Sequence, residues 1–480
     1  MFLKLLQNKQ IPWNTINVQI DKIKYKGDPS YCEQREIELN TFNEKISRGL
    51  LASNLDELKY LKIRIKDPSG NLLNILMDTI TKISCQPEEL EFSLAFDYNE
   101  KMPDYKRMDY NSDQYVDSIL QAIHYMGHKL KYLEVDFSSW SLAMDGINDK
   151  KVEKICQIFN FLPNLTSLRL SLFQWGLHNP DISGKSVINI CEGIQKIKLT
   201  SLHLDLGRWG CTRHDTLNIL EDNHVTIISQ FLSSYNQLLH LNLNLRSWGY
   251  SNNRITIDSF KSLGEGLIQL NNLKTLAVNF FMWGYNNQRI QTDSAIMFFE
   301  IFNYQKYQAF QNLTSIKFIF KGFQYCLNSS INIFFKNLTT LPNLLRLSLN
   351  ILGWQEVQVQ ISDEYMLKHG ISKIFSKIQG PVLIDCPYLI EFEEVTHSSY
   401  NKNIKQYYPV RKKLQHRKNI MKLIQLMKYQ KIKKQVLSSD HISIKPESMK
   451  ELHSESEINS SLTQIFRKEV VFELLEEYLI

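Results

Sequence analysis

The sequence predicts an α/β protein built as a repeat solenoid, in which parallel strands alternate with helices. Three observations support this fold class. Seven segments share leucines spaced with the period of a β-strand, an aromatic residue closes each segment at one fixed position, and a helical pattern follows the frame. The chain has 480 residues, which exceeds one ordinary compact domain, and a repeat array accommodates that length.

The repeats share the frame L-x-x-L-x-L-x-L-x-x-W-G. They open at Leu130, Leu165, Leu199, Leu238, Leu273, Leu313 and Leu344, and weaker copies open at Leu58 and Pro87. The eleventh position of the seven clear copies is always aromatic: Trp140, Trp175, Trp209, Trp248, Trp283, Phe323 and Trp354. Because a single ligand would not need seven identical platforms, we interpret this row as a buried spine between strands and helices.

Each repeat reads as a strand followed by a helix. The L-x-L-x-L core alternates with period two, and helical patterns follow at residues 183–197, 256–270 and 292–305. Serine or threonine near the start of several patterns offers a helix N-cap. The order strand, loop, helix, strand predicts parallel strands joined by helical crossovers.

The frame resembles the leucine-rich repeat of the long, ribonuclease-inhibitor-like type, over roughly residues 58–355. Residues 262–276 resemble the helix-to-strand junction of leucine-rich-repeat families expanded in single-celled eukaryotes. The resemblance implies a horseshoe with strands on the concave face and helices on the convex face, and a role in protein binding. The family's asparagine at position nine is absent, since Phe173, Gly207, Arg246, Phe281, Lys321 and Leu352 stand there. We expect the Trp-Gly pair two residues later to replace it by packing, with glycine permitting a tight turn.

Four segments follow from these patterns. Residues 1–57 are expected to form an N-terminal cap, and residues 58–397 a solenoid of about nine repeats plus a closing cap, with a strand or cap within 380–394. Residues 398–439 are predicted as a basic amphipathic helical segment. Residues 440–480 are predicted as a polar linker and an acidic amphipathic terminal helix, so the C-terminal tail is expected to be helical.

The residues between the strand leucines are expected to form the concave binding face. The candidates for partner contact are Glu134, Asp136, Arg169, His203, Asp205, His240, Asn242 and Asn244. This face lacks a row of lysines or arginines, so we do not expect nucleic acid to bind there. A cluster of His203, Asp205 and His240 could suggest a metal or acid–base site, but we interpret these residues as solvated surface.

The loops WGYSNNRIT (248–256) and WGYNNQRIQT (283–292) share a longer motif. It predicts that Tyr250 and Tyr285 stack one repeat apart. Such a pair could belong to a contact patch, since tyrosine and arginine are enriched in binding hot spots. Duplication of an asparagine-rich turn is the alternative that we favour.

The formal charge of +6 is concentrated in one tail segment. Residues 402–434 hold twelve lysines and arginines and no acidic residue. The candidate contacts are Arg411, Lys412, Lys413, Arg417, Lys418, Lys431, Lys433 and Lys434. A basic amphipathic helix can bind an acidic protein, a membrane surface, calmodulin or phosphate, and it can also pack on the solenoid or pair with the acidic terminus.

The common catalytic and nucleotide-binding motifs are absent from the sequence, and we expect no cofactor and no metal. The leading hypothesis is a non-enzymatic scaffold that binds a protein partner. The alternatives are a regulator of an enzyme (a small-GTPase activator or a ribonuclease-inhibitor-like protein) and an adaptor driven by the basic tail. Seven scattered cysteines and the lack of a long apolar run indicate a cytoplasmic protein, and a cytoskeletal assembly is one setting for it.

Overall fold

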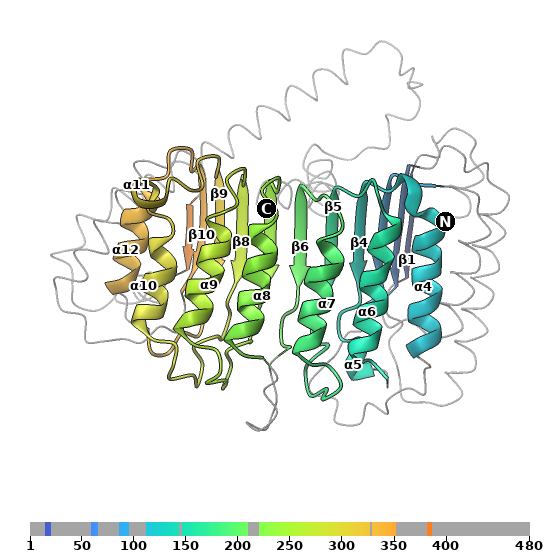
Figure 1. The fold of residues 1–480 in the computed structure, drawn as a ribbon, viewed down its shortest axis with the longest axis horizontal. Helices are drawn as coiled ribbons and strands as arrows, with labels where there is room; N and C mark the ends of the chain where they lie inside the picture. Colours follow the sequence, from blue (N-terminus) through green and yellow to red (C-terminus); the bar gives the residue numbers. More distant parts are fainter. Residues whose placement is uncertain are drawn as a thin grey trace, which may run out of the picture. The chain divides into compact units, whose positions relative to one another are not determined.

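The computed structural model describes residues 15–20, 59–65, 86–95, 112–143, 146–209, 220–326, 329–351 and 382–385. Its eleven strands form one sheet, and their order in the sheet follows their order in the chain (Figure 1). Every neighbouring pair is parallel. The strands are β1 (Thr15–Ile20), β2 (Tyr60–Ile65), β3 (Glu89–Ser93), β4 (Tyr132–Asp136), β5 (Ser167–Ser171), β6 (Ser201–Asp205), β7 (His240–Asn244), β8 (Thr275–Asn279), β9 (Ser315–Ile319), β10 (Arg346–Asn350) and β11 (Val382–Asp385).

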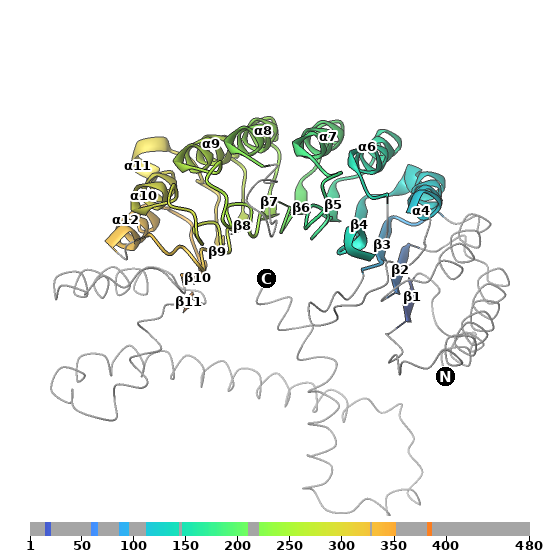
Figure 2. The same cartoon turned by 90° about the horizontal axis from the view of Figure 1, so that it is seen from below.

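The described helices are α4 (Ser112–Met126), α5 (Trp140–Ala143), α6 (Asp149–Gln157), α7 (Gly184–Ile194), α8 (Asp222–Ser233), α9 (Ile257–Leu267), α10 (Thr292–Glu300), α11 (Tyr304–Tyr307) and α12 (Ser329–Leu338), with 3-10 turns η1 (Gly127–Lys129) and η2 (Ile158–Phe161). Apart from the four-residue α5, which directly follows β4, these helices lie on one face of the sheet, as Figure 2 shows. The described chain is therefore an α/β stack of repeated strand–helix units, which confirms the solenoid-like arrangement and the parallel strands. A membrane could not be crossed by any helix of the described part, since none is both long and apolar enough.

The strand alternation explains how the two layers hold together. In β5, Leu168 and Leu170 are each 1% exposed, whereas Arg169 between them is half-buried. The register places Leu168 beside Leu202 and Leu202 beside Leu241, so equivalent leucines form continuous rows under the helices. Full burial of each such side chain contributes about 1.5–3 kcal/mol, and repetition multiplies that term along the stack.

Side-chain caps set the helix starts that the sequence predicts. Ser183 caps α7 and Thr256 caps α9, each accepting a hydrogen bond from the main chain two residues later. The third helical pattern gives α10, whose N-cap is Gln291 and not a serine or threonine. Asp222 of α8 also accepts from the amide and hydroxyl of Thr256, at 2.7 and 2.6 Å, which ties one helix start to the next.

The aromatic row is the buried spine that the sequence predicts. Trp140, Trp175, Trp209, Trp248, Trp283 and Phe323 are all 0% exposed, and Trp354 lies outside the described residues. Each described indole N–H also donates to a main-chain carbonyl of the preceding repeat: Trp140 to Leu94 (2.6 Å), Trp175 to Phe137 (2.6 Å), Trp209 to Leu172 (2.7 Å), Trp248 to Leu206 (2.7 Å) and Trp283 to Leu245 (2.5 Å). We call this row the indole ladder. The expectation of replacement by packing alone was incomplete, because the tryptophans also hydrogen-bond to the backbone.

The glycine after the tryptophan has a different role from the tight turn that we expected. A Cβ atom at Gly249 would lie 2.3 Å from the main-chain oxygen of Trp283, so glycine is required by the close approach of the next repeat. The left-handed turn occurs two residues earlier, before the tryptophan. Ser247 has φ of 64°, and Gln174 and Met282 at equivalent positions have φ of 69° and 61°.

The sheet extends beyond the repeats recognised in the sequence. Strand β1 lies within residues 1–57, the segment predicted as an N-terminal cap, and it pairs in parallel with β2. Strand β11 lies within 380–394, where a closing strand or cap was predicted. The basic segment 398–439 and the terminal segment 440–480 lie outside the described residues, so their predicted helices stay predictions.

Candidate functional site

Strands β2 to β10 place a layer of mostly polar side chains on the face opposite the described helices. We call this layer the polar face. Its central row follows the register from Lys62, Glu91 and Glu134 through Arg169, His203 and Asn242 to Ala277, Lys317 and Ser348. Because parallel strands lie about 4.8 Å apart, neighbours in this row can contact one another.

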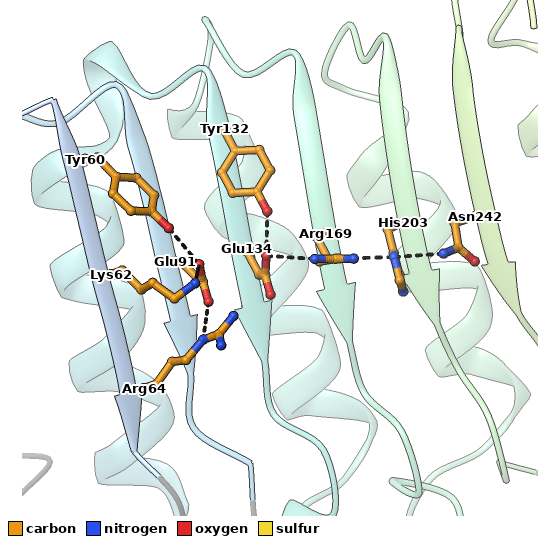
Figure 3. A network of polar contacts seen from close by, with 9 residues as sticks. All are labelled: Tyr60, Lys62, Arg64, Glu91, Tyr132, Glu134, Arg169, His203 and Asn242. Carbon is orange, nitrogen blue, oxygen red and sulfur yellow. Dashed lines mark hydrogen bonds and ion pairs between the residues drawn. The ribbon is translucent and has the colours of Figure 1, made fainter. Parts of the chain in front are cut away.

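The first cluster of the polar face surrounds Glu91, which is only 3% exposed (Figure 3). Its carboxylate accepts from the Tyr60 hydroxyl at 2.9 Å and pairs with Lys62 Nζ and Arg64 Nε, both at 2.6 Å. Burial alone would raise the pKa of Glu91, but these three donors outweigh it and hold the pKa below its usual value. The cluster therefore joins β2 to β3 through a charged carboxylate.

The second cluster connects four strands, from β4 to β7 (Figure 3). Glu134 Oε2 accepts from the Tyr132 hydroxyl at 2.5 Å and from Arg169 Nη1 at 3.2 Å. Arg169 Nε donates in turn to His203 Nδ1 at 3.1 Å, and Asn242 Nδ2 lies 3.1 Å from the same nitrogen. A nitrogen that accepts from Arg169 carries no proton, so Asn242 is the donor in the last contact.

His203 is held in its neutral form by this arrangement. Burial lowers the pKa of His203 to about 4, and the positive charges of Arg169 and Lys317 add to that effect. Near pH 7 the imidazole is thus uncharged: Nδ1 accepts from Arg169 and Asn242, and Nε2 carries the ring proton. The site therefore has a hydrogen-bond donor here and does not present an additional cation.

Three of the candidate contact residues accept main-chain hydrogen bonds where their strands end. Asp136, Asp205 and Asn244 each accept a hydrogen bond from the main-chain N–H two residues later, at 3.0, 3.0 and 3.1 Å. Burial raises the pKa of Asp205 to about 6, although hydrogen bonds from Gly207 and Asn244 oppose the rise. These side chains terminate strands as Asx turns, so their first role is structural.

The histidine–aspartate cluster of the sequence does not assemble into one site. His203 bonds to Arg169 and Asn242, whereas His240 Nδ1 lies 2.9 Å from Thr275 Oγ1. In the part of the chain that the structure describes, no group of three or more His, Cys, Asp or Glu residues could hold a metal ion.

Part of the polar network was not among the predicted contact residues: Tyr60, Lys62, Arg64, Glu91 and Tyr132. For Lys62 and Glu91, the sequence signal was the pairing of opposite charges at equivalent strand positions. The stacking of Tyr250 on Tyr285 was predicted and is confirmed: their ring centroids are 5.2 Å apart and the planes differ by 4°.

The asparagines of those same loops are structural. Asn252 and Asn287 are fully buried and donate to main-chain carbonyls of their own and neighbouring loops, at 2.7–3.0 Å. This agrees with the turn interpretation of the repeated motif. The eight basic tail candidates lie outside the described residues.

Comparison with known proteins does not assign this chain to a family. Neither a scan of the sequence against known protein families nor a search of curated proteins finds a match.

Proposed function

We propose that this chain is a non-enzymatic leucine-rich-repeat scaffold that binds a protein partner on its polar face. In this proposal the strand–helix units form a horseshoe, with the polar face concave and the helices convex. The leucine frame, the parallel register and the single-sided helix layer support it. Repeat solenoids offer extended surfaces of this kind to protein partners.

The observation that carries the proposal is the network from Tyr132 to Asn242. It fixes side chains on four consecutive strands through hydrogen bonds of 2.5–3.2 Å. Side chains that are ordered before binding lose less conformational entropy when a partner arrives. Beside the network, Ser201, Thr275 and Ala277 are small, so a partner can supply the larger side chains.

The test is affinity capture from native lysate with full-length protein. One variant combines Arg169→Ala, His203→Ala and Asn242→Ala, and a control combines Lys185→Ala, Glu192→Ala and Gln230→Ala on exposed positions of α7 and α8. Circular dichroism and urea unfolding verify that both variants fold. The proposal predicts that a protein retained by the wild type and the control is lost by the polar-face variant. Equal retention by all three proteins would contradict it.

The basic tail carries a second candidate function, because twelve cations stand in residues 402–434 without one acidic residue. We propose that this segment adds contact with an acidic partner or membrane surface. A full-length variant with Lys431→Gln, Lys433→Gln and Lys434→Gln tests it in the same capture, at low and high salt. Loss in this variant, together with release of the wild-type complex by salt, would assign binding to the tail.

The alternative proposal is that the chain regulates an enzyme, in which case the captured protein is a small GTPase or a ribonuclease. We propose that the chain acts in the cytoplasm, because the seven cysteines of the sequence are scattered and form no C-x-x-C pair. Cell fractionation of the full-length protein tests that placement.

A further inference from the structure

A hollow lies where strands β2, β3 and β4 begin. Its volume is about 510 Å³, and Lys59, Tyr60, Glu88, Glu89 and Tyr132 line it. Tyr60, Glu89 and Tyr132 occupy equivalent register positions on the three strands, so the two tyrosines stand on either side of the glutamate. The two tyrosine Cα atoms are therefore separated by two strand spacings, about 10 Å, which leaves room for a group between the rings.

Both rings are held in place by their hydroxyl groups. The Tyr60 hydroxyl donates to Glu91 and the Tyr132 hydroxyl donates to Glu134, at 2.9 and 2.5 Å (Figure 3). Burial and these hydrogen bonds raise the pKa of both tyrosines, so both remain neutral donors. A phenol that donates to a carboxylate has a more electron-rich ring, and the face of such a ring attracts cations.

Three carboxylates at or near the hollow are paired with cations. Glu88 pairs with Lys131 at 2.7 Å, Glu91 pairs with two cations at 2.6 Å, and Glu134 pairs with Arg169 at 3.2 Å. Glu89 is exposed, and within the described residues its carboxylate makes no ion pair, although Lys59 also lines the hollow. The hollow therefore combines an exposed carboxylate, which makes no ion pair among the described residues, with two aromatic rings whose hydroxyl groups are held in place.

We propose that this hollow binds the cationic end of an arginine or lysine side chain from the protein partner. The cation sits between Tyr60 and Tyr132, above Glu89. This inference rests on the proposed function, because it assigns the chemistry of one contact that a partner makes on the polar face. The partner is then a protein with an accessible basic side chain at its interface.

The test is titration of the full-length protein with a small cationic probe, followed by saturation-transfer NMR. The probe is Nα-acetyl-arginine methylamide, and its uncharged isostere Nα-acetyl-citrulline methylamide is the comparison. We expect the cationic probe to bind about fivefold more tightly than the isostere, as one cation–π contact beside a carboxylate provides. Nα-acetyl-lysine methylamide identifies which of the two cations fits better.

Two single variants locate the probe. Glu89→Gln removes the exposed carboxylate and is expected to weaken probe binding about threefold, as loss of one exposed ion pair does. Glu265→Gln, on an exposed position of α9, is expected to leave it unchanged. Tyr132→Leu removes one ring, and urea unfolding reports whether that variant still folds.

Failure of the probe to bind, or equal binding to the wild type and Glu89→Gln, would overturn the inference. That result leaves the proposed function intact, because its own variants lie on β5, β6 and β7. Conversely, a normal response to the probe with no effect of those variants on partner capture would remove the proposed function and keep the cation site.

Discussion

Removal of one indole N–H from the ladder should destabilise the protein without changing its packing. Trp248 is 0% exposed, and its Nε1 donates to the Leu206 carbonyl at 2.7 Å. Replacing Trp248 with β-(3-benzothienyl)alanine keeps the shape of the side chain but exchanges the N–H for sulfur. The Leu206 carbonyl then remains buried without that donor.

The magnitude follows from the cost of an unmade hydrogen bond in the interior. We expect the benzothienyl substitution to lower the free energy of unfolding by about 1–2 kcal/mol. Trp248→Phe should cost more, about 2–3 kcal/mol, because the smaller ring also leaves unfilled volume in the core. The difference between the two variants separates the packing contribution from the hydrogen bond.

The assay is urea unfolding of the full-length protein, followed by tryptophan fluorescence and by circular dichroism at the same protein concentration. Phe323→Leu is the matched control, since Phe323 occupies the same buried position in its repeat and has no N–H to lose. A benzothienyl variant as stable as the wild type would refute the reasoning, because the indole ladder would then contribute packing and nothing more.

Four further substitutions test individual contacts and charges. Gly249→Ala should lower the free energy of unfolding by about 1–3 kcal/mol, since the new methyl group would lie 2.3 Å from a main-chain oxygen, and urea unfolding measures it. Asp222→Ala should cost about 1–2 kcal/mol in the same assay, because it removes the acceptor for the N-cap of α9. His203→Gln should make stability less sensitive to acid: the pKa lowered from 6.5 to about 4 means that only the unfolded chain binds this proton between those values, so wild-type stability falls as the pH drops through that window. Asp205→Asn should change the pH dependence in the opposite sense, because the pKa raised to about 6 gives the folded chain the extra proton and that stability is lost as the pH rises towards 6.

Matched control substitutions accompany two of these variants. Gly207→Ala meets the movable ring of Phe173 at 2.8 Å and should cost less than Gly249→Ala. Asp258→Ala removes an exposed carboxylate from the first turn of α9 and should cost less than Asp222→Ala. An acid dependence of His203→Gln identical to that of the wild type would show that this imidazole titrates normally in the folded protein.

Much of the fold could be predicted from the sequence, because strand alternation and helix caps are patterns of residues close together in the chain. The alternation of Leu168 and Leu170 with polar residues reports which side of β5 is buried. Ser183 and Thr256 mark helix starts with their own side chains. Strand β1 was not predicted because the segment TINVQI, although it alternates polar and apolar residues, lacks the leucine frame that identified its neighbours.

The contacts between repeats could not be predicted in the same way. The acceptors of the indole ladder are main-chain carbonyls, which every residue has, so no sequence signal indicates them. The left-handed position before the described tryptophans holds residues that share no chemical type: Ser139, Gln174, Arg208, Ser247 and Met282. By contrast, Asp136, Asp205 and Asn244 recur at one strand-end position, and that recurrence was a usable sign of a structural turn.

The candidate site was predictable as a surface but not as a network. Alternation showed that Glu134, Arg169 and His203 share one face, yet the bonds between them depend on side-chain conformations that only the structure gives. The lowered pKa of His203 is likewise a property of its surroundings.

The central claim is that the polar face is where a protein partner binds, and photo-crosslinking tests it most directly. The photoreactive residue p-benzoylphenylalanine replaces Ala277, in the middle of the polar face on β8, in full-length protein. The same residue replaces Glu265 on the exposed side of α9 in the control. We expect the captured partner to crosslink to position 277 and not to position 265. Crosslinking at position 265 alone would contradict it.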